Sequence, residues 1–218
     1  MTSKPPVELG PWRQRARGLY DRLPTKWLIT GVSAVLLGAS ALLGGLDDVP
    51  TPPTPQFEPG DRYEATQLTI QPESASLIDG FPEHGVTPAE GNRLLVVIAT
   101  VENTWSDPVR IATGSTEPDS LVPVGIELAG EYRAPIDLIV FGDGTTVATV
   151  QPNVPVQVAY VWEVPAGSVA DGDDVRFDVL DREYQGEARI YFGDRFSDFH
   201  VAGYVTFTVE DLGAGVSG

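Results

Sequence analysis

Apolar residues follow two different patterns along this chain. Between Trp27 and Leu46, twenty consecutive residues carry no charge, and most of them are apolar. From about Tyr63 onward, apolar and polar residues alternate over short stretches that Gly, Pro, Asn and Asp separate. The first pattern predicts one long apolar helix, and the second predicts a series of short β-strands.

The apolar segment 27–46 is predicted to be a transmembrane helix. A helix of this length spans roughly 30 Å, about the thickness of the hydrocarbon layer of a bilayer. Six basic and two acidic residues precede it, which favours a cytoplasmic N-terminus and an extracytoplasmic C-terminal part. The sequence thus predicts a single-pass protein of the cell membrane, with the lipid bilayer as one partner.

Two alternatives for this segment stay open. It could be a buried helix of a soluble protein, although helices that are apolar all round are rare in β-rich chains. It could also be a signal peptide cleaved after Ala41, because Ala39-Ser40-Ala41 is typical of a cleavage site. The apolar run continues past that site to Leu46, which favours an uncleaved anchor.

Residues 1–26 are predicted to be a cytoplasmic basic segment with a short helix on the inner membrane surface. Apolar residues recur at helical spacing between Trp12 and Leu23, and basic residues lie off that stripe. Pro24 ends the pattern. The residues expected at the membrane interface are Trp12, Arg13, Arg17, Tyr20 and Trp27.

Three further segments follow the predicted helix. Residues 47–62 are rich in proline and are predicted to form an extended stalk of roughly 40 Å. Residues 63–211 carry strand signals and turn residues but no long amphipathic helix, which predicts an all-β fold, a two-sheet β-sandwich. Residues 212–218 are small and are predicted to form a flexible tail.

Two stretches of the β-rich region resemble a known family. The strand Leu94–Asn103 (LLVVIATVEN) is followed by Trp105 and Pro108, and Gln151-Pro152-Asn153 leads into the strand Val156–Pro165. These features are similar to those of bacterial membrane-anchored extracellular immunoglobulin-like domains of unknown function. Secreted mycobacterial immunogenic antigens have a similar sandwich.

The resemblance covers roughly residues 66–180, with long inserts near 79–92 and 113–135. It implies an immunoglobulin-like fold and an exported location. It implies no activity, because the family has no shared set of catalytic residues.

Charge narrows the choice of partner. From residue 47 onward the chain has 8 basic and 29 acidic residues, so this part should repel nucleic acid, whose binding depends on neutralising phosphates. Cysteine is absent, which excludes a disulfide, a thiolate nucleophile and a cysteine-ligated metal.

Motifs for catalysis are missing from the sequence. The two histidines, His84 and His200, are far apart and lack the neighbours of a triad hydrolase, and no phosphate loop or zinc-protease motif occurs. The acidic turn 171–174 could hold calcium, but it lacks the spacing of an EF-hand. No catalytic residue, cofactor or metal ligand is predicted.

Segment 182–204 is unusually rich in aromatic residues and arginine. It holds six of the fifteen Phe and Tyr residues of the chain together with three arginines. Some of these aromatics could simply pack the core, but Tyr and Arg are also favoured at protein interfaces. The candidate residues for docking a partner are Tyr184, Arg189, Tyr191, Arg195, Phe196 and Phe199.

Together these features predict a non-enzymatic, membrane-anchored interaction module, such as an accessory or scaffold subunit of a bacterial cell-envelope complex. Its partner is expected to be another membrane or envelope protein. The alternative is an extracytoplasmic sensor domain that binds calcium or a small ligand, and an enzyme is the least favoured class.

Overall fold

The computed structural model describes residues 52–114, 116–142, 149–187 and 193–213, and the helical residues Ser33 and Ala39. Residues 53–218 fall into one compact unit, which is described here by itself. Within the described part of the chain, no helix is long and apolar enough to cross a membrane. Of the predicted transmembrane helix 27–46, only Ser33 and Ala39 are among the described residues. Seven candidate site residues lie outside them too: Trp12, Arg13, Arg17, Tyr20, Trp27, Arg189 and Tyr191.

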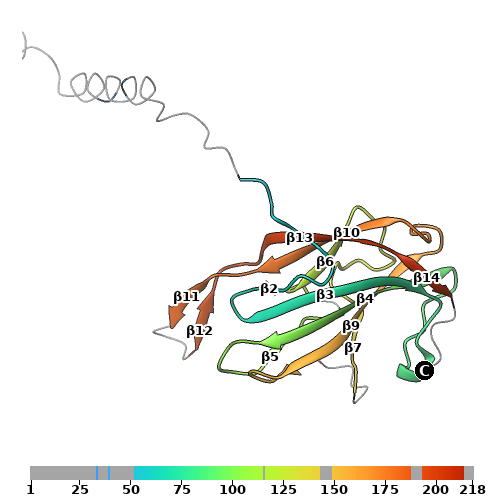
Figure 1. Ribbon diagram of the computed structural model, residues 1–218, viewed down its shortest axis with the longest axis horizontal. Coiled ribbons are helices and arrows are strands. Elements are labelled where there is room, and N and C mark those ends of the chain that lie inside the picture. The colour runs from blue at the N-terminus through green and yellow to red at the C-terminus, as the bar shows by residue number, and fades with distance from the viewer. Residues whose placement is uncertain are drawn as a thin grey trace, which may run out of the picture. The chain divides into compact units, whose positions relative to one another are not determined.

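The compact unit is an all-β sandwich of two sheets, which confirms the predicted β-sandwich (Figure 1). The strands of the first sheet are β1 (Gln56–Phe57), β6 (Leu121–Val124), β10 (Asp174–Asp181) and β13 (His200–Thr208). The strands of the second sheet are β2 (Tyr63–Glu64), β3 (Leu68–Ile78), β4 (Asn92–Asn103), β7 (Asp137–Val140), β9 (Pro155–Pro165) and β14 (Glu210–Gly213). Two separate pairs are β5 (Val109–Arg110) with β8 (Thr149–Val150), and β11 (Tyr184–Glu187) with β12 (Asp194–Phe196).

The strand order explains how the chain closes the sandwich. The first sheet has the order β1-β13-β10-β6 and the second has β14-β3-β4-β9-β7, with β2 also paired to β3. When the seven strands β3, β4, β6, β7, β9, β10 and β13 are lettered A to G, the sheets read A-B-E-D and C-F-G. This is the order found in seven-stranded immunoglobulin sandwiches.

Alternation of side chains along β4 and β9 builds the core between the sheets. The two strands pair over their whole length, from Asn92 opposite Pro165 to Glu102 opposite Pro155. The inward-facing members are fully buried: Leu95, Val97, Ala99, Val101, Val158, Tyr160, Trp162 and Val164. A contact between aromatic rings connects the two sheets. The ring centroids of Trp162 in β9 and Phe177 in β10 lie 5.6 Å apart.

The outer face of the second sheet is apolar as well. Leu94, Val96 and Val161 point away from the core and are nevertheless buried. Phe81 and Val86, from the segment between β3 and β4, pack on this outer face. That segment also contains the 3-10 turn η1 (Pro82–His84). Strand β4 is therefore apolar on both faces and buried on both from Leu94 to Val97.

Strand β6 lies where the sequence suggested only an insert, within residues 113–135. It pairs with β10 from Arg176 opposite Val124 to Val179 opposite Leu121. Its sequence LVPV carries Pro123, which has no N–H to donate and therefore weakens the strand signal. The proline is tolerated because β6 is the edge strand of its sheet.

Two short strands extend the sandwich into the segments predicted as stalk (47–62) and tail (212–218). Gln56–Phe57 pairs in parallel with β13, and the Tyr204 amide donates to the Pro55 carbonyl at 2.9 Å. The Phe57 ring lies against Gly203, where any Cβ would clash with it. At the other end, β14 extends the sandwich to Gly213 by pairing with β3. Strands β1 and β14, with two and four residues, carry too little alternation to be seen in sequence.

Replacing Phe177 with alanine should lower the free energy of unfolding by about 3–5 kcal/mol, because a fully buried ring would leave a cavity between the sheets. Urea unfolding followed by tryptophan fluorescence measures this. Val201→Ala, on an exposed side chain of β13, is the matched control and should cost less than about 0.5 kcal/mol. Similar losses for both variants would contradict the assigned core.

Candidate functional site

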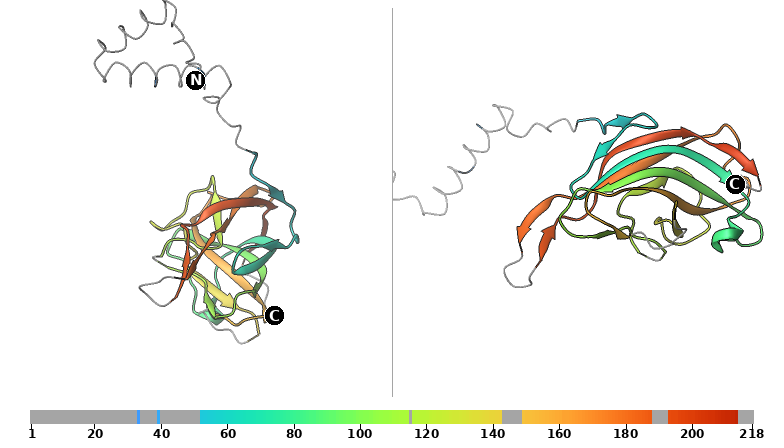
Figure 2. Two further views of the ribbon diagram at one scale, coloured as in Figure 1. Left: turned by 90° about the vertical axis from the view of Figure 1, so that its left-hand side faces the viewer. Right: turned by 60° about the horizontal axis from the view of Figure 1, so that its bottom comes forward.

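Three aromatic side chains cluster at the base of the β11–β12 hairpin, which extends from one end of the sandwich (Figures 1 and 2). The Trp105 ring lies 5.2 Å from Tyr184 and 5.5 Å from Phe196, and these two rings lie 5.6 Å apart. The Trp105 Nε1 donates to Asp194 Oδ2 at 2.9 Å. We call Trp105, Tyr184 and Phe196 the aromatic cluster.

Asn103 explains why Trp105 reaches the hairpin. It is fully buried at the end of β4, and its Nδ2 donates to the carbonyls of Asp107 and Val150, both at 2.8 Å. Its Oδ1 accepts the Trp105 amide at 2.8 Å. This side-chain turn fixes the loop after β4, because an asparagine can satisfy backbone groups that no strand partner reaches.

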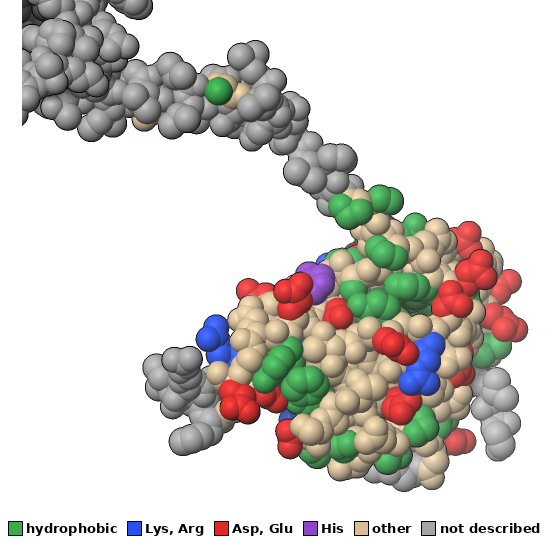
Figure 3. Space-filling model, turned by 60° about the vertical axis from the view of Figure 1, so that its left-hand side comes forward, with side chains coloured by type: hydrophobic (Ala, Val, Ile, Leu, Met, Phe, Trp, Pro, Cys, Tyr) green, Lys and Arg blue, Asp and Glu red, His purple; other side chains and the backbone are tan. Residues whose placement is uncertain are grey.

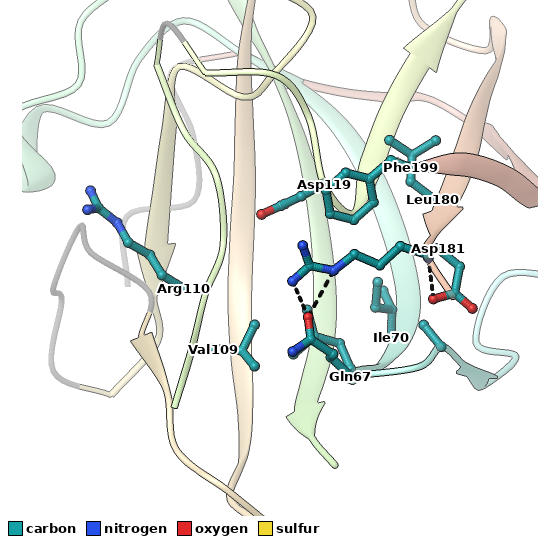
Figure 4. A pocket seen from close by; sticks show the side chains of 11 residues that line it. Gln67, Ile70, Val109, Arg110, Asp119, Leu180, Asp181 and Phe199 are labelled. Carbon is teal, nitrogen blue, oxygen red and sulfur yellow. Dashed lines mark hydrogen bonds between the residues drawn. The ribbon is translucent and has the colours of Figure 1, made fainter. Parts of the chain in front are cut away.

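Arg182 packs against one ring of the aromatic cluster and against Phe199. Its guanidinium carbon lies 4.3 Å from the Phe196 ring centre and 4.9 Å from that of Phe199. The guanidinium also donates to Gln67 Oε1 through Nε, at 3.0 Å, and through Nη2 (Figure 4). Stacking and hydrogen bonding together restrict the rotamers of these side chains.

Arg182 also lines a small pocket whose other lining residues are both polar, such as Gln67, and apolar, such as Ile70 (Figure 4). Its volume of about 30 Å³ is room for about one water molecule. Asp119 lines it and accepts the Ala112 amide through Oδ2 at 2.7 Å. The pocket is therefore too small to hold a substrate, and the arrangement serves to position Arg182 and the loop that carries Asp119.

Burial changes the protonation behaviour of these groups. Desolvation raises the pKa of Asp119, although the hydrogen bond from Ala112 and the charge of Arg182 act in the opposite direction. Desolvation lowers the pKa of Arg182, while the nearby carboxylates Asp119 and Asp181 raise it. Desolvation also raises the pKa of the Tyr160 hydroxyl, which is buried near Asp119.

The structure brings together three of the described docking candidates. Tyr184 and Phe196 belong to the aromatic cluster, and Phe199 packs on Arg182. Tyr184 is 44 % exposed and Phe199 38 %, so neither belongs to the core. Arg195 is also exposed, and its Nη2 donates to Gln185 at 3.4 Å.

The docking prediction missed Trp105 and Gln67, because both are distant in sequence from segment 182–204. The only sequence signal for Trp105 is Asn103, two residues before it, because asparagine favours a turn at the end of a strand. For Gln67 the sequence carries no signal.

The two histidines lie in different elements, and the carboxylates of the acidic turn accept hydrogen bonds. His84 lies in η1, whereas His200 begins β13. In the turn, Asp171 accepts the Asp211 amide, Asp173 accepts the Ala170 amide, and Asp174 accepts the Thr208 hydroxyl. Among the described residues, no group of three or more His, Cys, Asp or Glu side chains could hold a metal ion.

Two solved structures are similar to this chain, both at low sequence identity. No protein-family profile and no curated protein matches the chain. An uncharacterised β-sandwich protein of Clostridium difficile matches with a TM-score of 0.43 and 8 % identity, over 73 % of this chain and 97 % of its own. A candidate lipoprotein of Staphylococcus aureus matches with a TM-score of 0.32 and 10 % identity, over 72 % and 97 %.

Replacing Asp119 with asparagine should stabilise the fold at neutral pH. The folded protein holds this carboxyl with a raised pKa, so its charge costs stability at pH 7. The cost disappears as the pH falls through the folded pKa, so the advantage of Asp119→Asn should shrink on acidification. Urea unfolding at several pH values measures this.

The matched control for this prediction is Asp198→Asn, at an exposed position. It should change the free energy of unfolding by less than about 0.5 kcal/mol at every pH. A destabilised Asp119→Asn variant at pH 7 would show that the partners of the carboxylate outweigh its burial.

Proposed function

We propose that this chain is a single-pass membrane protein whose immunoglobulin-like sandwich lies outside the cytoplasm and binds another envelope protein without catalysing a reaction. Three features support the location: the uncharged segment 27–46, the basic residues before it, and the acidic remainder. The strand order A-B-E-D and C-F-G supports the immunoglobulin-like assignment.

The aromatic cluster is the observation that carries the proposed interaction. Tyr184 exposes 44 % of its surface although it packs against Trp105 and Phe196. Trp, Tyr and Arg dominate binding energy at interfaces, because they combine a large apolar area with a directional donor. Side chains that are already held in place also lose little conformational entropy on binding.

The surroundings indicate the charge of the partner. Acidic side chains are spread over the face shown in Figure 3, with only scattered basic ones. Next to the cluster, desolvation raises the pKa of the Tyr184 hydroxyl, and the nearby carboxylates Asp194 and Glu187 raise it further. A partner with an apolar patch edged by basic residues would therefore be steered to this end of the sandwich.

The location can be tested with single cysteines, because the chain has none of its own. In intact cells that lack an outer membrane, or after its permeabilisation, a membrane-impermeant maleimide should label Ser106→Cys and should not label Ser3→Cys. Labelling of Ser3→Cys should appear only after lysis. The opposite pattern, or labelling of neither site before lysis, would contradict the proposed orientation.

Tyr184→Ser should weaken capture of the partner by about tenfold or more, because hot-spot aromatics contribute 2 kcal/mol or more to binding. The measurement is affinity purification from solubilised membranes, with copurified proteins quantified by mass spectrometry. Ile136→Ser removes another exposed apolar side chain, 38 % exposed and just before β7, and is the control. Equal recovery of the partner with both variants would rule out the aromatic cluster as the docking surface.

A further inference from the structure

A much larger hollow lies away from the aromatic cluster, along β3. Its volume is about 750 Å³, within the usual range for small-molecule sites. The floor consists of Ser74, Ser76 and Ile78 of β3 with Val96 and Ile98 of β4, all on the outer face of the second sheet. We call this hollow the β3 groove.

Aromatic and aliphatic side chains form the walls of the β3 groove. Phe81 comes from the segment before β4, Phe141 follows β7, and Leu212 belongs to β14. Phe141 is 43 % exposed and Ile98 is only half-buried, although both lie among apolar neighbours. The groove thus leaves apolar surface in contact with solvent, and a bound apolar group would cover it.

Backbone pairing by an added peptide strand is disfavoured at this place. β2 pairs with the first residues of β3, and β14 pairs with its last residues, Ser76 to Ile78. Between them, the ladder is shifted at Pro72 and Ser74, and Pro72 has no N–H to offer. Bulges and prolines protect sheet edges against strand addition. The occupant must therefore bind through its own apolar body.

Charge indicates the head group of that occupant. Among the described residues that line the groove, two are acidic, Glu73 and Glu210, and none is basic. Each Glu73 carboxylate oxygen accepts one bond, from Thr100 and from Gln157. Nearby Arg93 is occupied by both oxygens of Asp211, at 2.6 and 2.7 Å, so it does not offset these carboxylates.

From these contacts we infer that the β3 groove binds a small compound that combines an apolar body with an ammonium group. The body covers Ile98 and the rings of Phe81 and Phe141, and the ammonium group lies toward Glu73 and Glu210. The excess of acidic residues after residue 46 also favours a positively charged ligand. This site is independent of the proposed docking surface.

The test uses the full chain in phosphatidylcholine nanodiscs, with Ser74→Cys as its only thiol. Ser74 is exposed and lines the groove. The rate of its modification by a neutral maleimide is measured with 4-phenylbutylammonium, 4-phenylbutanol or 4-phenylbutyrate. These three probes share one apolar body and differ in the head group. Ser106→Cys, exposed in the loop after β4, is the control position.

The ammonium probe should protect Ser74→Cys at about fivefold lower concentration than the alcohol, a gain typical of an exposed ion pair. The carboxylate should protect least, and Ser106→Cys should not be protected. Adding Glu210→Gln should reduce the advantage of the ammonium probe. Adding Ser76→Trp should abolish protection by filling the groove, with circular dichroism as the check that the variant folds.

Four results would overturn the inference. Equal protection by all three probes would show that the groove has no preference for a cation, and absence of protection would show that it binds none of them. Protection that persists in the folded Ser76→Trp variant would place the ligand elsewhere. A capped Leu-Lys-Leu peptide that protects at lower concentration than the ammonium probe would assign the groove to a peptide instead.

Discussion

Burial of β4 on both faces is the constraint on which the rest of the sandwich depends. A strand that is apolar on both sides needs two covers, since each exposed face would leave apolar area in water. The first sheet supplies one cover through Phe177 and its neighbours. The segment between β3 and β4 supplies the other through Phe81 and Val86. An apparent insert in the sequence is therefore part of the packing.

The segment between β3 and β4 covers only part of the outer face of β4. Leu94 and Val96, near the start of β4, are buried, whereas Ile98 is only half-buried. The polar pair Thr100 and Gln157 then takes over, with Glu73 folded across them from the bulge in β3. The β3 groove lies where the apolar cover ends and this polar group begins, which explains its mixed lining.

Sequence patterns predicted the long strands and the sandwich, because period-two alternation over eight or more residues is specific to half-buried strands. They failed for β1, β6 and β14, which have two to four residues each. Such strands are fixed by neighbours that are distant in sequence, as when Gln56 pairs with Tyr204. The candidate site was only partly predictable for the same reason. Tyr184 and Phe196 are near in sequence, but Trp105 joins them through the turn made by Asn103.

Strand β4 also separates the two candidate surfaces. Asn103, at its end, fixes the aromatic cluster, whereas Val96 and Ile98, near its middle, form part of the groove floor. The two surfaces share no residue, since the groove lining includes neither Trp105 nor Tyr184 nor Phe196, and β4 is paired on both sides between them. Binding at either surface should therefore leave the geometry of the other unchanged, and the two proposals can fail or succeed separately.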